Sequence, residues 1–330
     1  MRKREKYIDL AAGIMTVWVI VFHMIYPMFG SRELEIVPWL YFFMPWFFYK
    51  SGMMYHLRAT KEEWKNSANK LLVTFAIWSF IGYLAYISWL LFAGEITWRN
   101  ALYSPLRSLF LSASVPFNGA LWFLPILFLV RGIGNWLLQN IHVKWVVLFS
   151  LLLSIFVRIF HWRLMPIWIS GTLWGLFFFS VGYWMQGKET KPWNACFALD
   201  IYLTSLFTNI PSVYCGGQPL WAQILWLPVC VGGCITFNNL CRFFINVCQK
   251  FTPPLSDYSI LQYIGRNSIN FYVPHKIIFH IGFNLIIMYK LEWYNTYQGL
   301  LIVAAANIIL LPIINILIRK YDRFFHHTCV

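Results

Sequence analysis

The sequence predicts an all-α integral membrane protein with about ten transmembrane helices and both termini in the cytoplasm. Composition is the first reason: 59% of the 330 residues are hydrophobic and only 12% are charged, which is typical of a polytopic membrane protein and not of a soluble domain. Apolar segments long enough to cross a bilayer also recur along the whole chain, and most lysines and arginines lie between them.

The first apolar segment sets the orientation of the chain. Residues 10–29 carry no formal charge and would form about 30 Å of helix, which matches the hydrocarbon thickness of a bilayer. Arg2, Lys3, Arg4 and Lys6 precede this segment, and no small-residue cleavage pattern follows it. We therefore expect a retained first span with a cytoplasmic N-terminus, rather than a signal peptide that is removed.

Further apolar segments complete the predicted bundle, each bounded by charged or turn-forming residues. They cover residues 36–55, 71–93, 119–138, 145–161, 166–186, 194–213, 220–240, 268–289 and 298–318. With these spans in alternating orientation, the cytoplasmic side holds most of the basic residues, as the positive-inside rule requires. The outer ends and loops hold only Arg32, Arg99, Arg107, Arg158, Arg163 and Lys290.

Two longer connections separate these spans. The outer one, residues 94–118, contains Pro105, Pro116 and an apolar stretch, so we expect an interfacial or re-entrant piece. The cytoplasmic one, residues 241–267, contains a predicted turn at 253–257. No linker, low-complexity tract or internal repeat divides the sequence. Residues 1–330 are therefore predicted to form a single membrane domain without a soluble domain.

The net charge of +14 would suggest nucleic-acid binding in a soluble protein. Here the basic residues cluster between apolar segments, so they indicate topology and a possible anionic ligand, and we expect no nucleic-acid partner. The seven cysteines are scattered. Cys230 and Cys234 share a helix face but have no histidine or carboxylate nearby in the sequence, so neither a metal site nor a disulfide framework is predicted.

His23 is the first candidate functional residue. It lies about 20 Å from the cytoplasmic end of the first predicted helix, in the outer half of the membrane. Because burial in hydrocarbon disfavours the charged form, we expect this imidazole to face protein or water and to stay neutral near pH 7, which suits a general base. A histidine that bonds to a neighbouring helix and fixes its packing is the alternative.

Cations are predicted nearer the cytoplasmic side. Lys50 and Lys276 fall inside predicted spans, and a rim of basic residues lies below them: Arg58, Lys61, Lys65, Lys70 and Arg266. An anionic molecule that enters from the cytoplasm would meet positive charge first and a neutral base deeper, which suits an acyl-coenzyme A donor. Alternatively, Lys50 extends its amine to the lipid headgroups and the rim cations only fix topology.

Four short motifs occur in order along the chain. The first two are KYIDL at residues 6–10 with Gly13 and His23, and FMPWFF at 43–48 with Ser51 and Gly52. The last two are LWFL at 121–124 and YIGRNS at 263–268, which Tyr272 and His275 follow. In this order and over essentially the whole chain, they resemble the motifs of the membrane acyltransferases of acyltransferase family 3.

The resemblance implies a reaction and a set of site residues. Members of the family move acyl groups, usually acetyl, from cytoplasmic acyl-coenzyme A to hydroxyls of glycans or other acceptors at the outer face. His23 would be the catalytic base, and His275 belongs to the same pattern, although it could instead hold a structural hydrogen bond. The residues expected to bind the donor are Lys50, Lys70, Arg58, Arg266 and Lys276.

The sequence also departs from the family pattern. Many members carry a basic residue where this chain has Ala12, and a pair of arginines where it has only Lys70. Lys70 could replace one of that pair, and Lys50 is a candidate for a further donor-binding cation. The extra soluble transferase domain of longer members is absent, so His23 would act within the membrane part or pass the acyl group to a separate protein.

We therefore expect a multi-pass O-acyltransferase of the cytoplasmic (inner) membrane that uses acyl-coenzyme A, with acetyl as the expected acyl group, and requires no metal. Its acceptor would be a hydroxyl of a cell-surface or envelope glycan at the outer face. A transporter or flippase of lipid-linked glycans is the main alternative, because intramembrane cations also suit a diphosphate. A glycan polymerase and a succinyltransferase remain open, and the oligomeric state is not predicted.

Overall fold

The computed structural model describes residues 5–29, 40–159, 165–208, 219–251, 259–289, 292 and 296–327. Across these ranges the regular structure is helical, apart from an isolated bridge between Val115 and Asn118. The predicted all-α class is therefore confirmed for the described residues. Several residues used for the prediction lie outside them: Arg2, Lys3, Arg4, Arg32, Arg163, Lys290 and the turn at 253–257.

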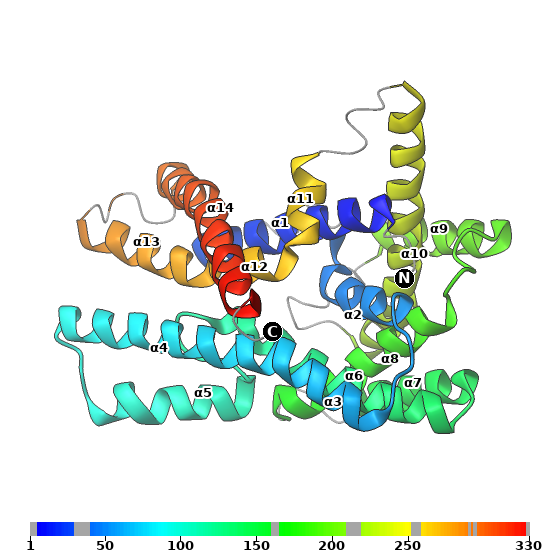
Figure 1. The fold of residues 1–330 in the computed structure, drawn as a ribbon, viewed down its shortest axis with the longest axis horizontal. Coiled ribbons are helices and arrows are strands. Elements are labelled where there is room, and N and C mark those ends of the chain that lie inside the picture. The colour runs from blue at the N-terminus through cyan, green and yellow to red at the C-terminus, as the bar shows by residue number, and fades with distance from the viewer. Residues whose placement is uncertain are drawn as a thin grey trace.

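The helices follow one another along the chain as Figure 1 shows. The first half contains α1 (Lys6–Phe29), α2 (Phe43–Met53), α3 (Thr60–Ser67), η3 (Ala68–Leu72), α4 (Val73–Ala93), η4 (Arg99–Tyr103), α5 (Ser104–Ser112), η5 (Gly119–Trp122), α6 (Phe123–Asn140) and α7 (Val143–Ile159). The second half contains α8 (Ile167–Trp184), α9 (Pro192–Leu206), α10 (Leu220–Phe251), α11 (Ile260–Arg266), α12 (Ser268–Tyr272), α13 (His275–Tyr289) and α14 (Tyr297–His327).

Six helical stretches in the described part are long and apolar enough to cross a membrane: Lys6–Ile25, Thr60–Ala93, Gly119–Asn140, Ile167–Trp184, Leu220–Lys250 and Tyr297–Lys320. The other expected spans correspond to shorter helices, α2, α7, α9 and α13. The chain is therefore a multi-pass membrane protein, whereas ten spans and cytoplasmic termini remain predictions. We call the end of the bundle that carries Gly94 and Ile167 the outer end, following the orientation that the charge distribution predicts.

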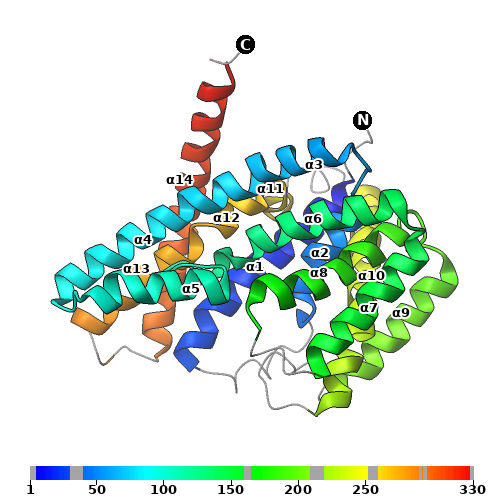
Figure 2. The same cartoon turned by 90° about the horizontal axis from the view of Figure 1, so that it is seen from below.

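The core of the bundle includes the contact between α2 and α8, which lie close together in the right-hand half of Figures 1 and 2. A Cβ atom at Gly52 would lie 1.8 Å from the carbonyl oxygen of Phe179, so the two backbones touch. Large aromatic side chains around this contact are fully buried, among them Trp46, Phe48 and Phe178. Close backbone approach through small residues is the packing that membrane helices favour.

Helix α11 packs against the first half of α1 as closely as α2 packs against α8. A Cβ atom at Gly13 would lie 1.8 Å from the carbonyl oxygen of Leu261, and one at Gly265 would lie 1.8 Å from that of Asp9. The Asp9 carboxylate then accepts a hydrogen bond from Nε of Arg266 at 3.0 Å. The motifs near the two ends of the sequence are therefore in direct contact.

The predicted span at 268–289 is not one helix. It consists of α12 and α13, which are separated at Val273 and Pro274. Proline has no backbone N–H and its ring clashes with the preceding turn, so α12 ends before Pro274 and α13 begins at His275. Helix α10 also differs from its prediction, because it continues past residue 240 to Phe251.

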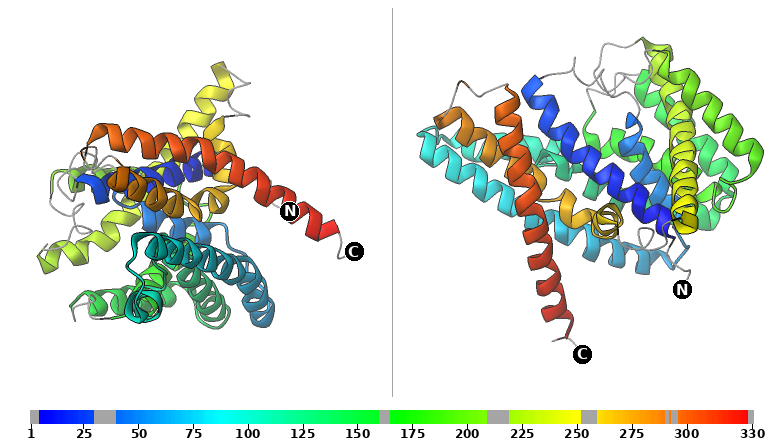
Figure 3. Two further views of the ribbon diagram at one scale, coloured as in Figure 1. Left: turned by 90° about the vertical axis from the view of Figure 1, so that its left-hand side faces the viewer. Right: turned by 90° about the horizontal axis from the view of Figure 1, so that it is seen from above.

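The outer connection at 94–118 is largely helical and is held against the bundle. Helices η4 and α5 run back beside α4 (Figure 2), and the Tyr83 hydroxyl donates to the carbonyl of Ala101 at 2.9 Å. The loop that follows places Ala113 and Phe117 at positive φ. In contrast, the C-terminal part of α14 extends away from the bundle (Figure 3).

Candidate active site

His23 and His275 form a histidine pair inside the bundle. His23 lies near the end of α1 and His275 is the first residue of α13. Nδ1 of His23 and Nε2 of His275 are 3.1 Å apart, within hydrogen-bond distance. His275 is buried, whereas His23 is partly exposed. The structure therefore brings together the two residues that the sequence proposed as catalytic.

The hydrogen bonds of the pair assign its tautomers. Nδ1 of His275 contacts the carbonyl oxygen of Tyr272, which can only accept, so this nitrogen carries the proton. In the neutral ring Nε2 of His275 is then an acceptor, and Nδ1 of His23 must donate to it. Nε2 of His23 is left with its lone pair. It is the atom of the pair that can accept a proton from another molecule.

The helix break at Pro274 makes this arrangement possible. The carbonyls of Tyr272 and Val273 lie at the end of α12 rather than inside a continuous helix. The first accepts from His275, and the second accepts from Nδ2 of Asn118 at 3.1 Å. The hydroxyl of Tyr272 also donates to the carbonyl of Ala120. The segment after α5 thus holds the break that positions His275.

Two other titratable residues of α13 lie near the pair. Nζ of Lys276 lies 5.2 Å from the ring centroid of Phe279, one turn further along the helix. The imidazole of His280 stacks on Phe117, with ring centroids 5.1 Å apart. Lys276 thus follows His275 directly, while the ring of His280 stacks on the loop after α5.

The predicted donor-binding cations lie on several different elements of the chain. Lys50 is in the last turn of α2, with Nζ 5.5 Å from the Trp46 ring centroid. Arg58 and Lys70 are exposed, before α3 and in η3. The backbone N–H of Arg58 donates to Oδ1 of Asn135 at 3.2 Å, and its carbonyl accepts from Nδ2 of the same residue at 2.9 Å. Their roles toward the donor remain predictions.

Arg266 already has a partner in this structure. Its ion pair with Asp9 joins α11 to α1, and the Asp9 side chain is almost fully buried while that of Arg266 is 44% exposed. Loss of this ion pair would remove a charged partner from a buried carboxylate, which is unfavourable. The structure therefore gives Arg266 a role in packing, in addition to the donor contact that the sequence suggested.

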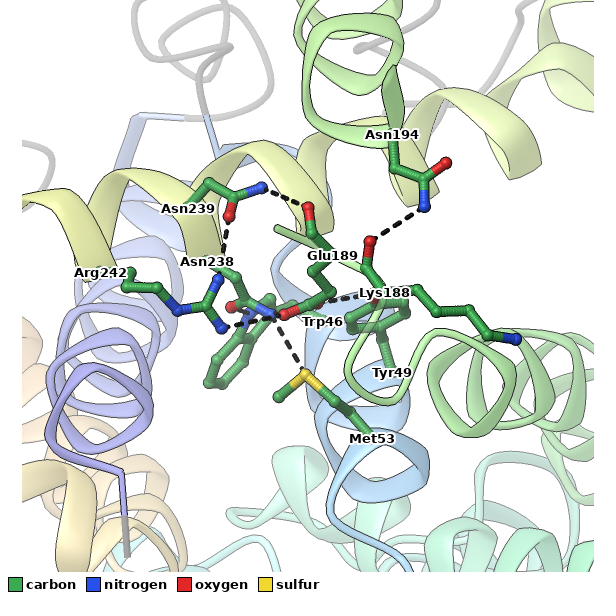
Figure 4. Close-up of polar contacts among 9 residues, drawn as sticks. All are labelled: Trp46, Tyr49, Met53, Lys188, Glu189, Asn194, Asn238, Asn239 and Arg242. Atoms are coloured by element: carbon green, nitrogen blue, oxygen red, sulfur yellow. Dashed lines mark hydrogen bonds and ion pairs between the residues drawn. The ribbon is translucent and has the colours of Figure 1, made fainter. Parts of the chain in front are cut away.

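The sequence analysis missed a buried polar cluster at the end of the bundle opposite the outer end (Figure 4). Glu189, in the turn between α8 and α9, accepts from the Tyr49 hydroxyl at 2.6 Å and from Nδ2 of Asn238 at 2.9 Å. Its second carboxylate oxygen lies 3.6 Å from the Arg242 guanidinium. Burial raises the pKa of Glu189 above its ordinary value, although these partners oppose the shift.

A second buried carboxylate was also missed. Oε1 of Glu63, in α3, accepts from Nε of Arg131 at 2.9 Å and from the Ser67 hydroxyl at 2.5 Å. The Glu63 side chain is fully buried, whereas that of Arg131 is 24% exposed. This pair connects α3 to α6. In the described part of the chain, no group of three or more His, Cys, Asp or Glu side chains could hold a metal ion.

A family model for an acyltransferase domain matches residues 5–318. The match covers nearly the whole chain and includes all four motifs and both histidines. The chain belongs to acyltransferase family 3. No curated protein and no solved structure matches it.

For a member of this acyltransferase family, the histidine pair has a clear chemical meaning. A neutral imidazole has one nitrogen without a proton, which can accept one. In His23 the hydrogen bonds of the pair make this nitrogen Nε2. A base with a fixed tautomer and a second group that orients it is the usual arrangement for activating a hydroxyl. The membrane acyltransferase thus contains a histidine pair in which hydrogen bonds fix the position of the proton on each ring.

Proposed function

We propose that this membrane O-acyltransferase transfers an acyl group, acetyl in the first instance, from cytoplasmic acyl-coenzyme A to a hydroxyl of a cell-surface or envelope glycan. The observation that carries the proposal is the 3.1 Å contact between His23 and His275 within a chain of this family. We further propose that the protein resides in the cytoplasmic membrane. There one end of the bundle faces the donor and the other faces the acceptor.

His23 acts as general base in the proposed reaction. Nε2 of His23 takes the proton of the acceptor hydroxyl while the hydroxyl oxygen attacks the thioester carbonyl carbon. The positive charge that develops on His23 is shared with His275, whose Nδ1 is bonded to the Tyr272 carbonyl. The C–S bond then breaks, and the coenzyme A sulfur takes the proton from His23. The ester and free coenzyme A leave, and the pair returns to its starting state.

The distribution of cations supports binding of an anionic donor from the cytoplasmic side. Arg58 and Lys70 are exposed there, so they are accessible to the phosphates of coenzyme A. Lys50 is in the last turn of α2, and Lys276 directly follows His275 in α13. In the proposal, these lysines hold the donor while its thioester reaches His23.

The test is acyl transfer in membrane vesicles that contain the wild-type chain or His23→Ala. Radiolabelled acetyl-coenzyme A is the donor, and extracted envelope glycan is the acceptor. We expect label on the glycan with the wild type and a loss of about 100- to 10,000-fold with His23→Ala, the range that general base catalysis provides. His280→Ala is the control, because the ring of His280 stacks on Phe117.

Two further results would change the assignment. Equal transfer by wild type and His23→Ala would show that His23 is structural. Transfer of succinyl but not acetyl, in a parallel assay with succinyl-coenzyme A, would change the assigned acyl group from acetyl to succinyl. The assigned reaction, O-acyl transfer, would stay the same. If neither donor binds the purified protein, a transporter of lipid-linked glycans becomes the better assignment, since a helix broken within its span also occurs in transporters.

A further inference from the structure

The loop between α5 and η5 has a strained backbone. Ala113 has a φ of 49° and Phe117 a φ of 65°, in the left-handed region that residues with a Cβ atom rarely occupy. For a bulky residue this conformation is unfavourable, and such strain is concentrated at functional sites, where surrounding contacts hold it. Here the Phe117 ring lies edge-on to that of Tyr86 in α4, with centroids 5.5 Å apart. The N–H of Asn118 donates to the carbonyl of Val115 at 3.1 Å and closes the turn.

Asn118 is the residue of this loop that reaches the break between α12 and α13. It is fully buried and packs against α4, where a Cβ atom at Gly82 would lie 3.0 Å from its own Cβ. Its Nδ2 donates to the carbonyl of Val273 at 3.1 Å, whereas its Oδ1 has no hydrogen-bond partner in the described part of the chain. A buried acceptor without a partner is unfavourable. The reason for an amide at this position is therefore the bond to Val273.

This bond acts where the chain leaves α12. The carbonyls of Tyr272 and Val273 lie at the C-terminal end of that helix, where carbonyls lack partners within the helix. Side chains supply donors to both: Asn118 donates to Val273, and Nδ1 of His275 donates to Tyr272. The two carbonyls belong to successive residues, and peptide units are rigid planes. A rotation of the Val273 peptide would therefore also change the direction of the Tyr272 carbonyl.

We propose that Asn118 is a positioning residue for the acyl transfer. Its amide fixes the backbone at Val273 and, through it, the Tyr272 carbonyl. That carbonyl holds His275, which in turn fixes the tautomer of His23. This inference rests on the proposed function, and it assigns a role to a residue outside the four motifs. It requires that Asn118 acts on the reaction only through His275.

Steady-state kinetics provide the first test. Asn118→Leu keeps the number of heavy atoms in the side chain but removes the donor, so kcat for transfer from acetyl-coenzyme A should fall by about tenfold while KM stays unchanged. Asn140→Leu is the matched control, because Nδ2 of Asn140 also donates to a backbone carbonyl, that of Trp136 at 2.7 Å, but at the exposed end of α6. It should leave both constants unchanged. Equal effects of the two variants would overturn the proposal.

A double variant shows whether Asn118 acts through His275. In His275→Ala the ring is absent, so the addition of Asn118→Leu should lower kcat no further. If Asn118 had an independent role in packing, the two losses would multiply, and this result would overturn the proposal. If the leucine variant does not fold, Asn118→Ala takes its place in every measurement, because the shorter side chain removes the same donor and cannot clash with α4.

A spectroscopic measurement separates this inference from the proposed reaction. Nitrogen NMR of the purified full-length chain in nanodiscs, with isotope-labelled histidine, reports which ring nitrogen carries the proton, and His275→Ala identifies the signals of that ring. We expect the proton on Nδ1 of His275 in the wild type and a mixture of tautomers in Asn118→Leu. If this change occurs but the wild type transfers no acyl group, Asn118 holds the ring as inferred and the proposed reaction is wrong. If the wild type transfers acetyl and the tautomer is the same in both proteins, the reaction stands and the role of Asn118 is wrong.

Discussion

Nδ1 of His23 lies 3.1 Å from Nε2 of His275, although 252 positions separate the two residues in the sequence. The contact joins the outer part of α1 to the start of α13. Because His275 is itself bonded to the carbonyl of Tyr272, its ring cannot rotate without losing that bond. His275 therefore positions His23 and fixes which of its nitrogens is free, and this gives it a role different from that of His23.

The first prediction separates these two roles. His275→Gln should lower kcat for acyl transfer by about 10- to 100-fold, because a base with a partner that no longer fixes its tautomer is less effective. KM for acetyl-coenzyme A should stay nearly unchanged. Steady-state kinetics of purified protein in nanodiscs measure both constants. A loss of kcat as large as that of His23→Ala would indicate that His275 itself reacts. A rise in KM as large as the fall in kcat would indicate a role in donor binding.

The second prediction concerns the contact between α1 and α11. A Cβ atom at Gly13 would lie 1.8 Å from a backbone oxygen, which cannot move aside as a flexible side chain can. Gly13→Ala should therefore force the helices apart and destabilise the protein by about 1–3 kcal/mol or more. Thermal unfolding of the detergent-purified protein measures this. Gly282→Ala, where the nearest atom would be 3.6 Å away, should be tolerated, and similar losses from both would argue against this packing.

The sequence was sufficient to predict the class of the fold and to single out two histidines that the structure brings into contact. The bilayer requires long apolar helices, so composition and periodicity reveal them directly. His23 was found because an imidazole in an apolar helix is costly. His275 was found only from the motif that contains it, since periodicity cannot show which helices face each other. The contact with His23 needed the structure.

Other features depended on tertiary contacts that the sequence does not display. Glu189 stands beside Lys188 and near Lys191, a pattern typical of a solvated turn, yet it is buried against α2 and α10. Arg266 was predicted to bind the donor as one of the rim cations, and its ion pair with Asp9 could not be inferred from the sequence. The break between α12 and α13 had a visible signal, because Pro274 lies within the predicted span.

The third prediction compares two neighbouring glutamates of α3. Glu63 is fully buried and paired with Arg131, whereas Glu62 is exposed. Glu63→Gln removes the charge that Arg131 faces and should destabilise the protein by about 3–5 kcal/mol, the cost of breaking a buried pair. Glu62→Gln should change stability by less than about 0.5 kcal/mol. Equilibrium unfolding in mixed micelles measures both, and equal values would contradict the assigned burial.

The last prediction uses the raised pKa of Glu189, which lies between α8 and α9 and outside the long apolar spans. The folded protein binds this proton more readily than the unfolded chain does. The free energy of unfolding should therefore fall as pH rises from the ordinary carboxyl pKa of about 4.3 towards the raised value, by at most about 1.4 kcal/mol per pH unit. In Glu189→Gln this pH dependence should disappear, because the amide oxygen can still accept from Tyr49 and Asn238 but the side chain no longer titrates.

Glu95→Gln, at an exposed position, should keep the wild-type profile. Thermal unfolding between about pH 4 and 8 provides the measurement. Parallel profiles for the wild type and Glu189→Gln would mean that Glu189 titrates alike in the folded and unfolded chains, so that its burial is compensated completely by Tyr49, Asn238 and Arg242.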